Sequence, residues 1–200
     1  MFVRLLAAVL LVPVVAAPAS RQARPIAPSV WNIDKAHSNV GFQIRHFVSK
    51  VRGGFGDFKG TITADDDAWQ NAQIDVEISS ASINTNSDGR DKDLRSSNFF
   101  AVDSFPAITF KSTKIERKGD DAKIYGDLTM RGVTKPVVLD GHFNGMQKAV
   151  RGDRIGFDAS TTINRLDYGV KWNRAAEGGG VMLGDDVKIE ISVEAVRAKS

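Results

Sequence analysis

Apolar and polar residues alternate with a period of two along most of the chain. Because neighbouring side chains of a strand point to opposite faces, such a run predicts a strand with one buried and one solvent face. Alternating runs occur at residues 40–45, 74–79, 123–129, 154–163 and 187–194. Roughly eight or nine antiparallel strands of this kind predict a sandwich or a closed barrel. A barrel of about eight strands is either packed solid or holds one small ligand.

Glycine-rich and polar stretches separate these runs and predict turns. The turn signals are Gly53-Gly54, Lys118 to Asp121, Gly132 with Pro136, Gly152-Asp153 and Gly184 to Asp186. We interpret Gly53, Gly54 and Gly56 as a bulged hairpin. The longer loop from Asp167 to Leu183 contains three consecutive glycines. We expect this loop to be too flexible for the core and to form a lid at one mouth.

A short helix is predicted where the strand pattern stops, within GRDKDLRSSNFFAVDSFPAITF (residues 89–110). Asp88 can cap the helix. Asp91 and Arg95, an acid four residues before a base, support one or two helical turns. The sequence therefore predicts an all-β fold with a short helical insertion around residues 88–100.

The second half of this insertion is aromatic. Its large apolar residues are too closely spaced for one face of a continuing helix: Phe99, Phe100, Val102 and Phe105. Pro106 keeps Phe105 out of the helical region and starts a new strand. We therefore expect a helical flap whose aromatic end closes the β structure.

The N-terminus has the pattern of a secretory signal. Arg4 precedes an apolar run over residues 5–15, which is followed by the small residues Ala17, Pro18 and Ala19. The run is shorter than the ~20 residues that a membrane-spanning helix requires. We expect cleavage after Ala19, with a retained anchor as the alternative. A linker over residues 20–30 and one domain over residues 31–198 follow.

Composition narrows the classes of protein. The chain has no cysteine, so neither a disulfide nor a lipoprotein anchor can form, and the domain depends on its apolar core. Loss of Arg4 with the signal lowers the formal charge from +3 to +2. No basic cluster suited to nucleic acid is present.

The sequence contains no assembled set of catalytic or metal-binding residues. His37 and His46 are nine positions apart, which places them on opposite faces of a regular strand. With no cysteine either, we expect no transition-metal site. We interpret His37 as satisfying backbone groups where a strand starts. Neither a G-x-S-x-G elbow nor a phosphate loop is present, so no catalytic residue is predicted.

Aromatic residues are the remaining candidates for function, and composition leaves two interpretations open. They form either a solid core or the wall of an elongated apolar cavity beneath the flap. The residues concerned are Phe42, Phe47, Phe55, Phe58, Phe99, Phe100, Phe105, Phe110, Phe157, Tyr168 and Trp172.

A series of short motifs recurs in order along the chain: Trp31-x-Ile33-Asp34-x-x-His37-Ser38, Phe55-x-Asp57-Phe58-x-Gly60, Arg90-Asp91-x-x-Leu94-Arg95-Ser96, Phe105-Pro106-x-Ile108-x-Phe110, Gly126-x-Leu128-Thr129 and Arg165-x-Asp167-Tyr168-Gly169. On these residues the chain resembles the YceI-like family of periplasmic polyisoprenoid-binding proteins. The chain departs from the family at Asp93, where relatives commonly have histidine. If that histidine helps to bind a ligand headgroup in relatives, this role is lost or altered in the present chain.

The resemblance implies an eight-stranded antiparallel, lipocalin-like barrel over residues 31–198 that binds a lipid and performs no catalysis. The ligand would be a polyprenyl lipid, such as a diphosphate, or an isoprenoid quinone, with no other cofactor. Candidate ligand-binding residues are Phe42, His46, Phe55, Phe99, Phe100, Phe105, Phe110, Leu128, Phe157, Tyr168 and Trp172. An anionic headgroup would meet cations at a mouth, namely Arg90, Lys92, Arg95 or Lys135.

Two other classes of function stay open. One is an enzyme acting on a lipid or isoprenoid, in which His46, Asp34 or Asp91 does acid-base work. The other is an interaction module with a solid barrel and no ligand. For the carrier, we expect a periplasmic location, no nucleic-acid partner and no membrane span. The sequence leaves the oligomeric state open, a homodimer included.

Overall fold

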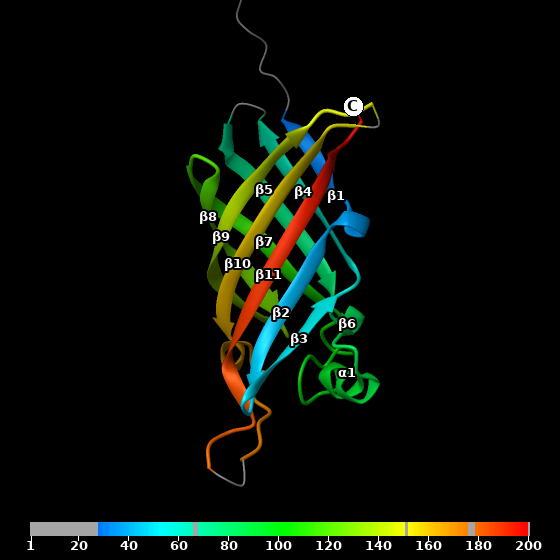
Figure 1. Ribbon diagram of the computed structural model, residues 1–200, viewed down its shortest axis with the longest axis vertical. Coiled ribbons are helices and arrows are strands. Elements are labelled where there is room, and N and C mark those ends of the chain that lie inside the picture. The colour runs from blue at the N-terminus through cyan, green and yellow to red at the C-terminus, as the bar shows by residue number, and fades with distance from the viewer. Residues whose placement is uncertain (1–27, 66–67, 151, 176–178, 200) are drawn as a thin grey trace, which may run out of the picture.

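The computed structural model describes residues 28–65, 68–150, 152–175 and 179–199. The predicted signal over residues 1–19, and the linker as far as residue 27, lie outside the described residues. Figure 1 shows an elongated barrel. The C-terminus lies at one end of the barrel, and the helix α1 (Asp88–Arg95) lies toward the other.

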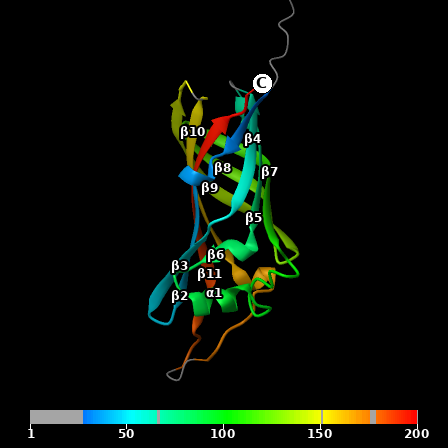
Figure 2. The ribbon, with the colours of Figure 1, turned by 90° about the vertical axis from the view of Figure 1, so that its right-hand side faces the viewer.

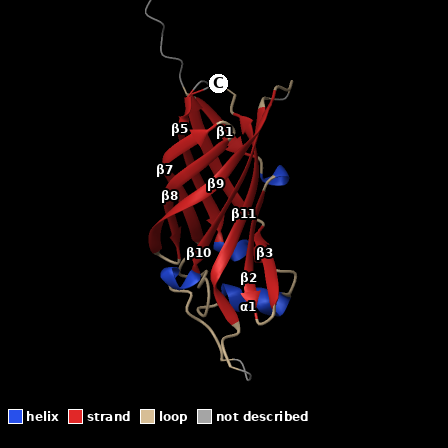
Figure 3. Cartoon of the chain, turned by 60° about the vertical axis from the view of Figure 1, so that its left-hand side comes forward, coloured by secondary structure: helices blue, strands red, loops and turns tan. Residues whose placement is uncertain are grey.

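The wall of the barrel is built from eleven strands within the described residues, all paired antiparallel in one sheet. Their bounds are β1 (Ser29–Ile33), β2 (Asn39–His46), β3 (Ser49–Phe55), β4 (Phe58–Asp65), β5 (Ala68–Ser79), β6 (Ile83–Asn84), β7 (Ala107–Lys118), β8 (Asp121–Met130), β9 (Val133–Gln147), β10 (Arg154–Asn164) and β11 (Leu183–Arg197). Short 3₁₀ turns are η1 (Lys35–His37), η2 (Ser80–Ser82) and η3 (Arg165–Tyr168). Figure 3 shows that the helical segments gather at the α1 end, apart from η1 on the side of the barrel.

The eleven strands occupy eight positions in a closed barrel. Strands β1 and β2 both pair with β11, so together they make one interrupted strand. In the same way, β3 pairs with β2 and β4 pairs with β1, so β3 and β4 make a second interrupted strand. Next to it, β6 pairs with β3 and β5 pairs with β4, so β5 and β6 make a third. The pairing of β1 with β11 closes the sheet. The predicted eight-stranded antiparallel barrel with a short helical insertion is therefore confirmed.

The flap is anchored to β6 by its charged residues. Asp91 is 4% exposed and accepts hydrogen bonds from the amide and the hydroxyl of Thr85, the former at 2.9 Å. Arg95 donates to the backbone oxygens of Ala81 (2.8 Å) and Ile83 (2.6 Å). Thus Asp91 and Arg95 hold the helix to the preceding segment.

None of the helices in the described parts of the chain has the length and apolar character needed to cross a bilayer.

Three local predictions are corrected by the structure. The helix N-cap is Ser87 rather than Asp88, and Ser87 makes no side-chain capping bond. Two of the predicted turns are strand segments instead: Gly53 and Gly54 lie inside β3, and Gly184 to Asp186 lie inside β11. A Cβ at residue 53 would lie 2.6 Å from the ring of Phe42, so this glycine allows two strands to approach closely.

The loop between β10 and β11 is also more ordered than its glycines indicate. Tyr168 and Val170 are buried at its start and Leu183 is buried at its end. Arg165 is 3% exposed and donates to the backbone oxygens of Gly184, Val170 and Trp172. This buried guanidinium therefore fixes most of the loop against the end of the barrel, although residues 176–178 lie outside the described residues.

Candidate functional site

The interior of the barrel contains an apolar cavity of about 490 Å3. Its wall consists of the inward-facing members of the alternating runs; on β11 these are Val187, Ile189, Ile191 and Val193. The intervening Lys188 and Glu190 pair with each other on the outer face. Pockets for small ligands have volumes of about 300–1,000 Å3, so this cavity has the size of a binding site.

The cavity is long and narrow. Along β11 it is lined from Leu183 to Val193, and Met182 extends the lining by one residue. At a rise of about 3.3 Å per residue, Met182 to Val193 spans about 36 Å along the strand. A strand tilt of about 40° reduces this to about 28 Å along the barrel axis.

Most of the predicted ligand-binding residues line this cavity. They are Phe42, His46, Phe55, Phe99, Phe100, Phe110, Leu128, Phe157 and Trp172. Phe105 does not line it and packs against Gly132, where a Cβ would lie 2.7 Å from its ring. Phe47, which was also among the aromatic candidates, is 40% exposed on the outside.

Tyr168 is buried behind the cavity wall rather than in it. Its side chain belongs to the core cluster that includes Ile108, Leu128 and Ile163, and it is 2% exposed. The hydroxyl has no hydrogen-bond partner among the described residues. Burial, and secondarily the charge of Asp167, raises the pKa of Tyr168 to about 12.

An aromatic cluster lines the end of the cavity away from α1. Trp69, Phe143 and Phe157 form a triangle with ring centroids 5.1 to 6.0 Å apart, and Trp31 lies 6.0 Å beyond Trp69. The guanidinium of Arg117 lies 5.5 Å from the centre of the Phe143 ring. Of these, sequence reasoning named only Phe157 as a ligand contact. Phe143 alternates with the polar residues His142 and Asn144 on β9, and this pattern could have predicted that its ring faces the interior.

The other end of the cavity is covered by the flap and the β10–β11 loop (Figure 2). Phe99 packs against Trp172 at 5.3 Å, and Phe100 packs against Phe55 at 5.8 Å. Arg131 joins the two covering segments, because it donates to the carbonyl of Gly169 (2.6 Å) and to that of Ser97 (3.0 Å). We refer to this end, where loop and helix segments rather than strands cover the cavity, as its mouth.

Of the four predicted headgroup cations, only Arg90 lines the cavity. Its guanidinium donates to the hydroxyl (2.7 Å) and the carbonyl (2.9 Å) of Thr85. Arg95 is committed to backbone oxygens, while Lys92 and Lys135 are exposed outside the cavity wall. Asp93, the departure from the family pattern, lines the cavity near Arg90 and accepts a 3.1 Å hydrogen bond from Asn98.

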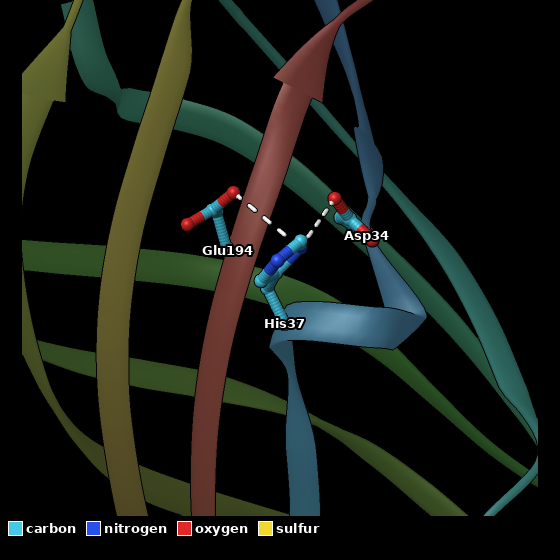
Figure 4. A group of neighbouring side chains, drawn as sticks. All are labelled: Asp34, His37 and Glu194. Atoms are coloured by element: carbon cyan, nitrogen blue, oxygen red, sulfur yellow. Dashed lines mark hydrogen bonds and ion pairs between the residues drawn. The ribbon is translucent and has the colours of Figure 1, made fainter.

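A polar cluster on the outside of the barrel brings Asp34, His37 and Glu194 together (Figure 4). Their potential ligand atoms all lie within 4.8 Å of one another, and His37 Nδ1 is 2.9 Å from the Asp34 carboxylate. The guanidinium of Arg154 contacts both carboxylates. A metal ion would have to displace Arg154, so the cluster is better explained as an ion-pair network joining the β1–β2 junction to β10 and β11.

The charges in this network stabilise one another. The hydrogen bond from His37, followed by those from Ala36 and Arg154, outweighs burial and holds the pKa of Asp34 below its usual value. The expectation that His37 satisfies backbone groups is wrong, because its ring meets a carboxylate. That backbone task belongs to Ser38, whose hydroxyl donates to the Glu194 carbonyl (3.2 Å) and accepts from the Glu194 amide (3.0 Å).

The three residues considered for acid-base chemistry lie in separate places. Asp34 precedes β2 and faces outward, while His46 ends β2 and lines the cavity. The seven residue steps of β2 separate its ends by about 23 Å. Asp91 lies on α1 itself and is buried against Thr85, which donates two hydrogen bonds to it. These side chains therefore form no shared site.

Comparison with known proteins places this barrel in a family. The YceI-like domain family matches residues 31–195, which is most of the chain. The chain belongs to the YceI-like family. Its curated relatives include a UPF0312 protein of Staphylococcus aureus strain bovine RF122. The two are 41% identical over 167 residues, which covers 82% of this chain and 95% of the relative.

Solved YceI-like structures share the fold. The Campylobacter jejuni YceI protein is 34% identical, covers 84% of this chain and 96% of its own, and superposes with a TM-score of 0.67. BcnA of Burkholderia cenocepacia has a TM-score of 0.72 at 20% identity, with 82% and 99% of the two chains covered. A polyisoprenoid binding domain from Saccharophagus degradans has a TM-score of 0.62 at 16% identity, with 84% and 98% covered. The last two likenesses concern the fold alone.

Proposed function

We propose that this protein is a secreted, periplasmic carrier or store for one long-chain isoprenoid lipid, held in the barrel lumen without catalysis. The observation that carries the proposal is the continuous apolar cavity, lined by aromatic rings at one end and covered by a flap at the other. Each methylene transferred from water into such a lumen contributes about 0.8 kcal/mol. A long chain can thereby offset the entropic cost of binding.

The length of the lumen supports a long-chain ligand. One leaflet of a bilayer accounts for about half of the ~30 Å hydrocarbon core, or about 15 Å. The lumen, at about 28 Å along the axis, is nearly twice as long. An ordinary acyl chain would leave much of the apolar wall between Trp69 and Trp172 uncovered, whereas a polyprenyl chain would cover it.

The mouth supports a headgroup with few charges. A diphosphate would need several cations inside the lumen, and Arg90 is the one member of the predicted headgroup set that lines it. Arg165 also lines it but is committed to backbone oxygens and to Asp185. The exposed cations on the outer surface at this end, Arg45, Lys50, Lys171 and Arg174, are not part of the cavity lining. Asp93 places a carboxylate beside Arg90. An isoprenoid quinone or a polyprenol therefore suits this mouth better than a polyprenyl diphosphate. The polyisoprenoid binding domain of S. degradans shares the fold, but at 16% identity it adds nothing on the ligand of this chain.

The proposal is tested by obstructing the lumen from its wall. Ala159 lines the cavity on β10, and Thr162 on the same strand is exposed outside it. Ala159→Trp should lower the affinity for an added polyprenol or quinone at least tenfold, while Thr162→Trp leaves it unchanged. Val137→Phe, a smaller obstruction, gives a second variant if Ala159→Trp melts at a much lower temperature.

Affinity should also rise with the number of isoprene units until the lumen is full. Titration of a fluorescent polyene or a quinone with the purified protein measures both effects. Equal affinity of the wild type, Ala159→Trp and Val137→Phe for every ligand would refute binding in the lumen.

A further inference from the structure

An exposed apolar tip stands beside the mouth of the lumen. The β2–β3 turn carries Phe47, which is 40% exposed, and Val48, which is 99% exposed. Val181 of the β10–β11 loop is 58% exposed. The Phe47 amide donates to the Met182 carbonyl at 2.8 Å, so the turn and the loop lie side by side. Figures 1 and 2 show the β2–β3 turn and the loop at the same end of the barrel as α1.

The position of Phe47 is held by its surroundings. Its φ of 48° lies in the left-handed region, which a bulky residue rarely adopts without constraint. Arg45 donates to the Phe47 carbonyl (3.0 Å), and Ser49 donates to the His46 carbonyl (3.1 Å). The Phe47 ring packs edge-on against His46 at 4.8 Å. The turn therefore presents its apolar side chains as a defined surface.

This surface is continuous with the lumen. His46 and Met182 line the cavity, and their chain neighbours Phe47 and Val181 face solvent. An apolar molecule at the tip would thus be one residue away from the cavity wall on both segments. A contiguous exposed apolar patch commonly marks a surface that contacts a protein, a ligand or a membrane.

The apolar tip is surrounded by cations. Arg45 and Lys50 are exposed and lie directly opposite each other in the β2–β3 register, an unfavourable arrangement for like charges. Lys171 and Arg174 are exposed on the adjacent loop. Residues 45–52 contain no acidic residue. At the start of β11, Asp185 is paired with Arg165 at 3.2 Å, and Asp186 is exposed. Glu177 lies outside the described residues.

We propose that this tip, formed by Phe47, Val48 and Val181, docks the barrel mouth on the surface of a bilayer that contains anionic lipids. Apolar side chains that enter the interface, together with flanking cations that meet lipid phosphates, constitute the usual pattern of interfacial binding. Docking concerns the outer surface and requires no lipid in the lumen. It goes beyond lipid carriage, because it identifies the membrane itself as the direct partner at the mouth.

Vesicle binding by the mature protein tests the proposal, with two exposed valines as a matched pair. Val48 lies at the tip, and Val150 is equally exposed in the β9–β10 connection at the opposite end of the barrel. On vesicles of equal parts phosphatidylcholine and phosphatidylglycerol, Val48→Ser should weaken binding about tenfold, while Val150→Ser has no effect. Lys50→Gln should weaken binding about fivefold.

Further measurements distinguish docking of the tip from lipid uptake into the lumen and from self-association. Pure phosphatidylcholine vesicles should bind much more weakly, and Ala159→Trp should bind anionic vesicles like the wild type even when its lumen is obstructed. Equal binding by Val48→Ser and Val150→Ser would overturn the proposal. The proposal would also be overturned if the wild type did not bind anionic vesicles but formed a dimer, and if Val48→Ser dissociated that dimer. The tip would then be an interface between copies of this chain.

Discussion

The ring of Phe110 packs directly on Gly126, in space that any side chain at residue 126 would occupy. The Lys111 carbonyl oxygen would also lie 2.5 Å from a Cβ at this position. Gly126→Ala should therefore cost about 1–3 kcal/mol of unfolding free energy through overpacking. Gly89→Ala on α1 meets no atom within 4 Å and should stabilise the protein by about 0.5–1 kcal/mol. Chemical denaturation measures both, and equal effects of the two substitutions would contradict this packing.

The link that Arg131 makes between the flap and the β10–β11 loop should control how fast a ligand leaves. Its two hydrogen bonds reach Gly169 and Ser97 on different covering segments. Arg131→Gln should raise the release rate of a bound isoprenoid at least tenfold, because each such charged hydrogen bond contributes about 1.5–3 kcal/mol. Lys135→Gln, at an exposed cation on β9, is the control and should leave release unchanged. Stopped-flow displacement measures the rates, and identical rates for both variants would exclude a closing role for Arg131.

The attachment of the flap should weaken in acid. Burial raises the pKa of Asp91, but the two hydrogen bonds from Thr85 and the charges of Arg95 and Arg90 outweigh it and leave this pKa below its ordinary value of 3.8. Because the folded-state pKa is depressed, the stabilisation is present above about pH 4 and is lost as the pH falls through the folded-state value.

Asp91→Asn should remove this acid dependence. The variant should also lose about 1–3 kcal/mol at neutral pH, whereas Asp88→Asn at the exposed start of α1 should lose less than 1 kcal/mol. Hydrogen exchange of the α1 amides as a function of pH measures the effect. Parallel pH profiles for the wild type and Asp91→Asn would count against it.

The buried hydroxyl of Tyr168 should lower the unfolding free energy at neutral pH, because it has no hydrogen-bond partner among the described residues. In alkali the unfolding free energy should fall further, because the unfolded chain ionises its tyrosine before the folded one does. Because its folded-state pKa is raised to about 12, the neutral phenol is favoured, and this contribution disappears as the pH rises from about 10 through 12. Tyr168→Phe removes an unpartnered hydroxyl and should raise the unfolding free energy by about 1 kcal/mol.

Ultraviolet titration distinguishes the two tyrosines of the chain. One phenol should ionise only near pH 12, and Tyr168→Phe should abolish that transition. Tyr125→Phe, which removes the phenol bonded to Glu116, should retain it. A Tyr168 that ionises near pH 10 would mean that its hydroxyl is solvated.

The barrel was largely predictable because strand alternation is a local property of the sequence. Val187, Ile189, Ile191 and Val193 recur at every second position, and a strand has no other way to bury them together. The error at Gly53 arose from the same local view. This glycine allows Phe42 to pack closely across strands, and only the pairing of β2 with β3 makes that visible.

The candidate site was predictable only in part. A sequence pattern indicates which side chains point to the interior of the barrel, but not whether such a side chain reaches the cavity or is buried behind its wall. Phe99 and Phe100 line the cavity, but Phe105 packs on Gly132 and Tyr168 lies behind the wall. The cations were harder still. Charge alone does not distinguish Arg95, which is committed to backbone oxygens, from Arg90 at the cavity.

The occupancy of the lumen is the most direct test of lipid carriage. The protein should be purified from the cells that naturally produce it and weighed by native mass spectrometry, and organic extraction should then identify what is bound. We predict one long-chain isoprenoid lipid or quinone per chain, lost on organic extraction. An empty protein that also fails to take up added isoprenoids would contradict the proposed function.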